Sequence, residues 1–336
     1  MRKKNLSNSI TFLVPIKNRP SELNRLLKNC KKVFKKLNYY FLIIDASNQR
    51  NRIENLKIIS RYKNIKLIKQ KSKGIQKGCL EGIKYIKTKY TSFLYDDDVM
   101  GDHINKIYKS NILKNQIFSF GYGVVKDINE NVTFKNLSAI KIKKDDMISY
   151  YFGNNINKEF KNLNFQNKIV LPVSPICTSF KTSFLKKWEK VLNDFVYGNS
   201  FRNYFFFKKE VGPDLLTFLL SIDESNKTIK FFYPFSVKFS SHQKSISVIY
   251  GNAFLRIGYW LARICYFNQN TNINTKTKNE AYTYLISLGF FILITNLFNR
   301  FYFRNTLIEI LKLIKNRNFR FSFYFLINLI INKIFK

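Results

Sequence analysis

Three consecutive acidic residues are the most distinctive chemical feature of the sequence. Asp96, Asp97 and Asp98 directly follow the apolar run at residues 90–95. Neighbouring carboxylates repel each other unless a cation joins them, and Mg²⁺ or Mn²⁺ prefers carboxylate oxygens that it shares with substrate phosphates. Side chains alternate along a strand, so Asp96 and Asp98 would point the same way if the strand continued through them. The run therefore predicts a divalent-cation and diphosphate site. An acidic turn that caps the next helix is the alternative.

Two single residues further along the chain are also candidates. Asp214 follows Gly212 and Pro213, an order that by itself is typical of the start of a helix. The helix dipole would lower the pKa of Asp214 and keep the carboxylate ionised. His242, one of two histidines, follows the strand-like run at 230–239. It lies in a polar loop, where a solvated side chain is the plain alternative.

The elements that must position these residues alternate in the first part of the chain. Apolar runs predict strands at 10–16, 39–44, 64–68 and 90–95, and helical spacing predicts helices at 23–37 and 75–86. Pro15 marks the end of the first strand as an edge or exit. Such alternation favours an α/β, doubly wound sheet, in which the carboxyl ends of the strands face the ligand crevice. Asn18, Asp45 and the acidic run occupy such positions.

The order of four segments resembles a known family. The segments are TFLVPIKNRP, FLIIDAS, KGIQKGCLEGI and SFLYDDD. Together they resemble the GT-A fold glycosyltransferases that use nucleotide-diphospho-sugars, in particular the family 2-like inverting group of bacterial surface polysaccharide synthesis. The resemblance covers residues 10–100 well and 101–245 in fragments. It implies a Rossmann-like, mostly parallel doubly wound sheet with a C-terminal helical extension. The implied division is a GT-A domain at 1–248, with halves at about 8–100 and 101–248, and a helical region at 249–336.

The resemblance also implies roles for individual residues. Nucleotide-sugar binding is expected at Pro15, Asn18, Arg19, Asp45, Ser47, Gly74, Lys77, Asp96 and Asp97. The metal, Mn²⁺ or Mg²⁺, is expected at Asp96, Asp98 and His242. Asp214 is the implied general base for direct displacement with inversion, although Pro213 replaces the glutamate usual before it.

The amino-acid composition narrows the kinds of protein and partner that remain possible. The chain has 336 residues, of which 46% are hydrophobic and 17% aromatic, so wholesale disorder is excluded. Its 4 cysteines form no C-x-x-C pair, which argues against a zinc knuckle and fits a reducing cytosol. The net charge of +37 indicates a polyanionic partner or, alternatively, the coding bias of an AT-rich genome. Either origin leaves a surface that favours anionic lipid head groups or diphosphates.

The last part of the sequence leaves several alternatives open. Residues 281–298 carry no charge and predict a membrane span, an interfacial helix or a core helix. In the stretch 306–316, one apolar face is expected from Leu307, Ile310, Leu311 and Ile314.

The expected partners and location follow from these features. The partners are a nucleotide-diphospho-sugar, first a UDP-sugar, and a glycan or lipid-linked acceptor, without nucleic acid. The expected location is cytoplasmic, with peripheral contact at the anionic inner membrane. The alternatives are a non-catalytic GT-A-like scaffold and a basic nucleic-acid-binding protein. A nucleotidyltransferase would need a glycine-rich loop at residues 17–20, which the chain lacks.

Overall fold

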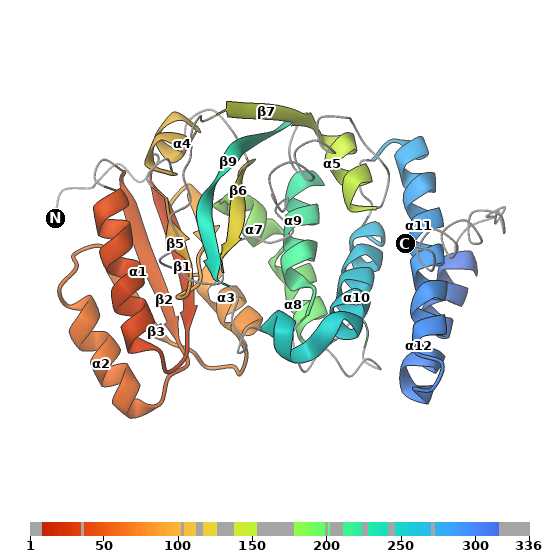
Figure 1. Ribbon diagram of the computed structural model, residues 1–336, viewed down its shortest axis with the longest axis horizontal. Helices are drawn as coiled ribbons and strands as arrows, with labels where there is room; N and C mark the ends of the chain where they lie inside the picture. Colours follow the sequence, from red (N-terminus) through yellow and green to blue (C-terminus); the bar gives the residue numbers. More distant parts are fainter. Residues whose placement is uncertain are drawn as a thin grey trace.

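The computed structural model describes residues 9–34, 37–101, 104–111, 117–125, 138–152, 178–198, 201, 211–223, 228–240, 246–269 and 273–315. These residues form a nine-stranded mixed sheet with helices on both faces (Figure 1).

The N-terminal half of the sheet is parallel. Its strand order is β3-β2-β1-β4, with β1 at Ile10–Ile16, β2 at Tyr39–Asp45, β3 at Ile65–Lys69 and β4 at Tyr90–Phe93. The crossovers contain α1 (Pro20–Val33), α2 (Gln49–Ile59) and α3 (Ile75–Ile83). The four predicted strands are therefore present, whereas α2 was not expected.

Alternating side chains bury both faces of this half. In β1, Phe12 and Val14 join the core under α1, while Leu13 joins the core under α3. In β2, Ile43 and Ile44 divide in the same way between the two cores. A parallel strand covered by helices on both sides has this continuous apolar character. The loops at the strand ends are thereby fixed to a rigid, doubly covered sheet.

The second half of the sheet is mixed. The path continues as β4-β8-β6-β9-β5, and β7 also pairs with β9. The strands are β5 (Val99–Met100), β6 (Ile117–Val125), β7 (Ser138–Lys143), β8 (Thr178–Lys181) and β9 (Thr228–Ser240). β8 is antiparallel to β4 and β6, while β6 and β9 are parallel. The α/β class predicted from the sequence is confirmed.

The remaining helices cover the sheet and extend it to one side. They are α4 (Ile104–Asn111), α5 (Lys144–Tyr151), α7 (Thr182–Lys187), α8 (Glu189–Val196), α9 (Pro213–Asp223), α10 (Ile246–Phe267), α11 (Thr275–Thr295) and α12 (Arg300–Lys315). In Figure 1, α9 and α10 lie next to the sheet, and α11 and α12 form the far edge. The expected C-terminal helical part is therefore present.

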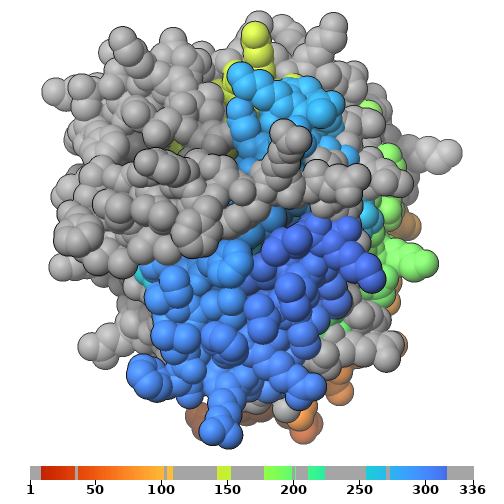
Figure 2. Space-filling model, turned by 90° about the vertical axis from the view of Figure 1, so that its right-hand side faces the viewer, coloured from red at the N-terminus to blue at the C-terminus, as the bar shows by residue number. Residues whose placement is uncertain are grey.

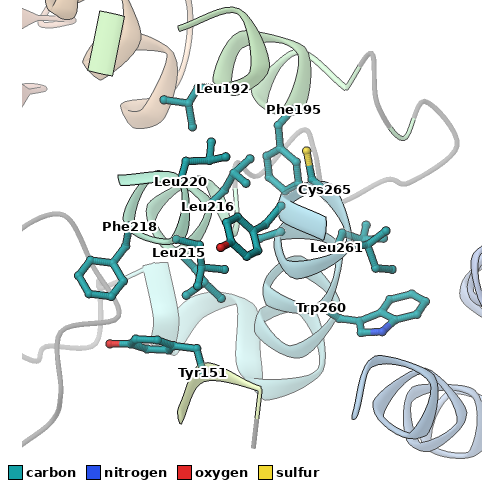
Figure 3. Close-up of a cluster of buried hydrophobic side chains, with 14 of the residues drawn as sticks. Tyr151, Leu192, Phe195, Leu215, Leu216, Phe218, Leu220, Trp260, Leu261 and Cys265 are labelled. Atoms are coloured by element: carbon teal, nitrogen blue, oxygen red, sulfur yellow. The ribbon is translucent and has the colours of Figure 1, made fainter. Parts of the chain in front are cut away.

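A large apolar cluster joins α8, α9 and α10. Leu216 of α9 and Leu261 of α10 are among its fully buried members, and Phe195 of α8 closes it (Figure 3). Trp260 of α10 lies toward α11 and donates a hydrogen bond from Nε1 to the Leu285 carbonyl at 2.8 Å. The C-terminal helices thus share one core with α9, the helix that begins with Pro213 and Asp214.

The structure shows how residues 281–298 and 306–315 fold. Most of 281–298 lies in α11, whose inner residues such as Leu285 and Ile292 are buried. None of the described helices is long and apolar enough to cross a membrane. In α12, Ile310 is buried, but Leu311 is 55% exposed and Ile314 36% exposed. The residues of the expected apolar face are therefore only partly covered, because Leu311 and Ile314 stay accessible.

Candidate functional site

The ends of β1, β2 and β4 lie at one edge of the sheet because these strands are parallel. The chain leaves β1 toward β2 and β3 and returns to pair β4 with the other side of β1. The crevice at such a switch point is the usual ligand site of an open α/β sheet. Arg19, which follows β1, bridges this point, because its Nη1 lies 2.9 Å from Asp96 Oδ1 and 3.3 Å from Asp97 Oδ2.

The acidic run forms a turn. β4 ends at Phe93, so strand alternation cannot align Asp96 with Asp98. Instead, the Asp98 amide donates to the Tyr95 carbonyl at 3.2 Å, and the Tyr95 amide donates to Asp98 Oδ2 at 3.3 Å. Asp96 and Asp97 both face Arg19. In this structure Asp96 and Asp97 share the Arg19 guanidinium. The expected pairing of Asp96 with Asp98 at a metal ion stays a prediction.

Asp98 has the environment of a cation ligand. Its side chain is fully buried, and Oδ1 has no hydrogen-bond partner among the described residues. Burial, together with the charge of Asp97, raises the pKa of Asp98 well above its usual value. Burial also raises the pKa of Asp96 to about 6, although Arg19 opposes the change. A buried carboxylate oxygen without a donor fits a hard divalent ion, which would keep the group ionised.

The described residues supply only part of a metal shell. Among them, no group of three or more His, Cys, Asp or Glu side chains is arranged to hold an ion. His242, the expected further ligand, lies outside the described residues. Its role stays a prediction.

The loop after β2 holds a buried carboxylate. Asp45 is fully buried, and its Oδ1 accepts from the Ser47 amide at 2.7 Å. Its Oδ2 accepts from Asn55 Nδ2 at 3.3 Å and lies 3.5 Å from Arg52 Nε. Both partners come from α2. The helix that sequence patterning missed therefore supplies the cation and the amide that stabilise Asp45.

Asn18 connects this loop to the end of β1. Its backbone N–H donates to Ser47 Oγ at 2.8 Å, and its side-chain Oδ1 accepts from the backbone N–H of Asn48 at 2.9 Å. Asn18 has a φ of 54°, a left-handed conformation that asparagine tolerates better than most residues. The next residue is Arg19, so this turn joins the Asp45 loop and the acidic turn into one polar cluster at the strand ends.

Three other predicted residues lie at the margin of the crevice. Pro15 is in β1 beyond the last residue paired with β4, so its missing N–H costs no bond there. Gly74 precedes α3 with a φ of 114°. The Lys77 ammonium lies 4.8 Å from the centre of the Tyr197 ring. Gln76, between these two, hydrogen-bonds Tyr95. Among the described contacts, Gln76 rather than Lys77 joins α3 to the acidic turn.

Asp214 begins α9, as predicted, but its electrostatics differ from the expectation. Burial raises its pKa from 3.8 to about 6, against the opposing effect of backbone N–H donors and a hydrogen bond from Tyr259. The expected lowering by the helix dipole is therefore wrong, because desolvation outweighs it. Tyr259 Oη, from α10, donates to Asp214 Oδ2 at 3.4 Å. No cation pairs with Asp214 among the described residues.

Tyr95 joins the acidic turn to Asp214. Its phenol is within electrostatic range of both Asp98 and Asp214, and burial raises its pKa well above the usual value. The two carboxylates, far apart in sequence, thus face one region of the protein. Tyr95 could have been suspected from its place before the acidic run. Tyr259 gave no sequence signal, because it lies within an apolar helix.

A separate hollow of about 1040 Å³ lies between α1 and α2. It begins at Pro20 and Ser21, next to Arg19, and is lined further out by Arg50, Lys57 and Arg61. None of the acids described above lines it. It therefore lies beside the crevice on the outer surface of the two helices.

Comparison with solved structures identifies the fold. Residues 1–349 of TarS from S. aureus, in complex with UDP-GlcNAc, match with a TM-score of 0.61 and 15% identity over 91% of this chain and 81% of that chain. TarS 1–349 in another crystal structure matches with a TM-score of 0.55 and 14% identity over 86% and 73% of the two chains. The structure of S. aureus TarS matches with a TM-score of 0.53 and 14% identity over 84% of this chain and 43% of that chain. These similarities confirm the GT-A fold.

The sequence itself matches a family model. No curated protein matches the sequence significantly. The model described as glycosyl transferase family 2 matches residues 11–188, which include β1 to β4 and the acidic turn. This match covers more than half of the chain. The chain therefore belongs to glycosyl transferase family 2 and is a glycosyltransferase.

Proposed function

We propose that this glycosyltransferase moves a sugar from a nucleotide-diphospho-sugar to a hydroxyl of a glycan or lipid-linked acceptor, with inversion at the anomeric carbon. The observation that carries the proposal is the polar cluster at the strand ends, where Arg19 contacts Asp96, Asp98 is buried, and Asn18 links the turn to the Asp45 loop. The complex of TarS with UDP-GlcNAc supports a UDP-sugar as the first donor to test.

The donor would lie across the crevice. Pro15, Asn18, Asp45 and Ser47 would contact the nucleoside, because the linked loops present polar groups beside β1 and β2. Arg19 and the turn at 96–98 would contact the diphosphate. Gly74 and Lys77 stay predictions for the same donor. Lys77 would have to leave the ring of Tyr197 to reach it.

A divalent ion, Mn²⁺ or Mg²⁺, would be held by Asp98 and Asp96, with His242 as a predicted ligand. When bound, it would act as a Lewis acid that neutralises charge on the leaving diphosphate. The protein residues prepare this place in advance. None of the described residues donates a hydrogen bond to Asp98 Oδ1, and Arg19 limits the repulsion between Asp96 and Asp97.

Asp214 would be the general base. The acceptor hydroxyl would lose its proton to Asp214 as its oxygen attacks the anomeric carbon on the face opposite the diphosphate. One C–O bond forms while the other breaks, so the configuration inverts. A pKa of about 6 leaves Asp214 mostly ionised at pH 7 and close to the pH of operation, as an effective base requires.

We also infer contact with an anionic lipid surface, from the cytoplasmic side. The turn after α11 exposes Leu297 and Phe298, and α12 exposes Phe301 and Leu311. The exposed residues Arg300, Arg304, Lys312 and Lys315 lie on α12, which is adjacent to α11 on the face shown in Figure 2. Apolar side chains interleaved with cations suit the head-group region of an anionic bilayer.

Vesicle binding tests this lipid contact. We expect sedimentation with phosphatidylglycerol vesicles, weaker binding to phosphatidylcholine, and loss of binding in Leu297→Ser/Phe298→Ser with an unchanged melting temperature. An Ile53→Ser/Leu56→Ser variant changes two exposed apolar residues on α2 and is the matched control. Equal binding by both double variants would contradict this surface as the contact site.

A thermal-shift panel tests donor and metal together. We expect a UDP-sugar to raise the melting temperature only with Mn²⁺ or Mg²⁺, and Asp98→Asn to abolish that increase. Release of the nucleoside diphosphate in the same samples tests catalysis. Stabilisation without any turnover would favour the non-catalytic scaffold. Stabilisation by oligonucleotides alone would favour the nucleic-acid-binding alternative.

A further inference from the structure

We propose that Tyr259 is a positioning residue for Asp214, and that α10 therefore completes the active site. This inference rests on the proposed role of Asp214 as general base. The hydrogen bond from Tyr259 Oη is the side-chain hydrogen bond that the described residues supply to Asp214. The two residues are 45 positions apart, so the contact depends on the packing of α9 against α10.

The backbone fixes this packing next to the hydrogen bond. Gly212, at φ 104°, lies so close to α10 that an added Cβ would be 2.4 Å from the Gly258 carbonyl oxygen. A Cβ on Gly258 would be 2.8 Å from the Val211 carbonyl oxygen. The glycine before α9 and the glycine before Tyr259 therefore allow each other's approach. This contact places the Tyr259 hydroxyl beside the first turn of α9.

The other side of Tyr259 is anchored by a half-buried arginine. Arg263 donates from Nη1 to the Tyr259 carbonyl at 3.1 Å and from Nε to the Tyr151 carbonyl at 2.7 Å. Its guanidinium also lies 6.0 Å from the Phe152 ring and 5.8 Å from the Tyr284 ring. Arg263 thus connects α10 with α5 and α11. The C-terminal helices restrain the segment that carries Tyr259.

The effect of Tyr259 on the pKa of Asp214 can be measured separately from that of other groups around α9. Tyr95 and Tyr259 are the described titratable groups that face Asp214. The other helices that pack against α9 contribute apolar or aromatic side chains. Leu185 comes from α7, Leu192 and Phe195 come from α8, and Tyr151 of α5 contacts Phe218. Lys144 of α5 and Tyr266 of α10 contact Asp223 at the far end of α9. At a rise of 1.5 Å per residue, Asp223 lies about 14 Å along the helix from Asp214.

Removal of the Tyr259 hydroxyl has a defined expected effect. A hydrogen bond to a carboxylate favours the ionised form, so its loss raises the pKa of that carboxylate. In full-length Tyr259→Phe, we expect the acid limb of the pH profile of kcat to move upward by about half a pH unit. Turnover at pH 6 should fall about two- to threefold, with a smaller change at pH 8 and an unchanged KM for the donor.

The experiment measures nucleoside diphosphate release from a UDP-sugar between pH 5 and 8. Tyr302→Phe, which removes the hydroxyl of a buried tyrosine of α12, is the matched control and should keep the wild-type profile. A Tyr259→Phe profile that superimposes on the wild type, or a change in KM alone, would overturn the inference. Asp214→Asn separates the two proposals. If it retains turnover, the base assignment fails. If it is inactive while Tyr259→Phe behaves as wild type, only the positioning role fails.

Discussion

Carboxylates in two regions of this molecule have different partners. At the strand ends of the N-terminal half, Asp45 lies beside Arg52 and Asp96 beside Arg19. At the start of α9, Asp214 has backbone N–H groups and the Tyr259 hydroxyl but no cation among the described residues. Burial raises the pKa of Asp96 and of Asp214 to about 6, but a guanidinium opposes the rise only at Asp96 among the described residues.

The difference corresponds to two chemical tasks. A crevice for a charged donor benefits from fixed ion pairs and preorganised donors. A general base must instead take up a proton near the pH of operation. The N-terminal half is therefore suited to binding, and the junction of α9 with α10 to proton transfer. The following predictions test this division, from the largest expected effect to the smallest.

The largest effect is expected from Asp214→Asn. The amide cannot accept the proton, so turnover should fall by about 10²- to 10⁴-fold. Affinity for the UDP-sugar, measured by calorimetry with Mn²⁺, should change less than about twofold, because donor contacts lie in the other region. Asp223→Asn, at the far end of α9, is the control. A parallel loss of donor affinity would show that the two regions are not functionally separate.

Gly212→Ala should break the contact between α9 and α10. The new Cβ would meet backbone atoms of Gly258 at a positive φ, and we expect a loss of about 2–4 kcal/mol in urea unfolding. In Gly78→Ala, the added Cβ would meet the flexible end of the Gln70 side chain at 2.6 Å, so the cost should be smaller. Equal costs for the two variants would argue against a rigid junction at Gly212.

The pH dependence of stability should reveal the raised pKa of Asp214. The folded pKa of Asp214 is about 6 against 3.8 for the free group, so the folded state holds more protons between these values. The free energy of unfolding of the wild type should therefore fall as pH rises from about 4 to 6, because ionised Asp214 destabilises the folded state. Asp214→Asn has no carboxylate to ionise at this position, so it should be more stable than wild type by up to about 3 kcal/mol above pH 7.

Comparison of the two proteins isolates this effect, because the other acids titrate in both. The stability gap, from urea unfolding at pH 4 and pH 8, should be small at the lower pH and large at the higher one. A gap that is independent of pH would contradict the raised pKa of Asp214.

The smallest effect is expected in the N-terminal crevice. Arg52→Met leaves the buried Asp45 without its cation and should cost about 1–2 kcal/mol, because Arg52 is itself partly exposed. Donor affinity should weaken, while the pH profile of kcat should stay unchanged. Arg50→Met, on the same helix and exposed, is the control. A shifted pH profile in Arg52→Met would show that the crevice also sets the protonation of the base.

Sequence patterns predicted the parallel half of the sheet well because its strands are apolar on both faces. β1 has the expected bounds, Ile10–Ile16. The helix α2 escaped notice because it exposes Ile53 and Leu56 and buries Asn55, which leaves no apolar stripe. The amide of Asn55 is buried to bind Asp45, a functional reason that periodicity does not express.

The site was predictable where chemistry follows a strand and less so where it depends on tertiary packing. The acids at 96–98 and Asp45 come directly after strands, so their common edge could be inferred. The early end of β4 at Phe93, which turns Asp96 toward Arg19, could not. The raised pKa of Asp214 also escaped prediction, because the enclosure comes partly from α10, which is distant in sequence.

The anomeric configuration of the released sugar tests the central claim most directly. With a UDP-α-sugar and water as the acceptor, ¹H NMR at early times distinguishes the two anomers before mutarotation mixes them. Direct displacement assisted by Asp214 predicts the β-anomer as the first product, and loss of that signal in Asp214→Asn. The α-anomer as first product, in an enzyme that still depends on Asp214, would contradict single displacement with Asp214 as base.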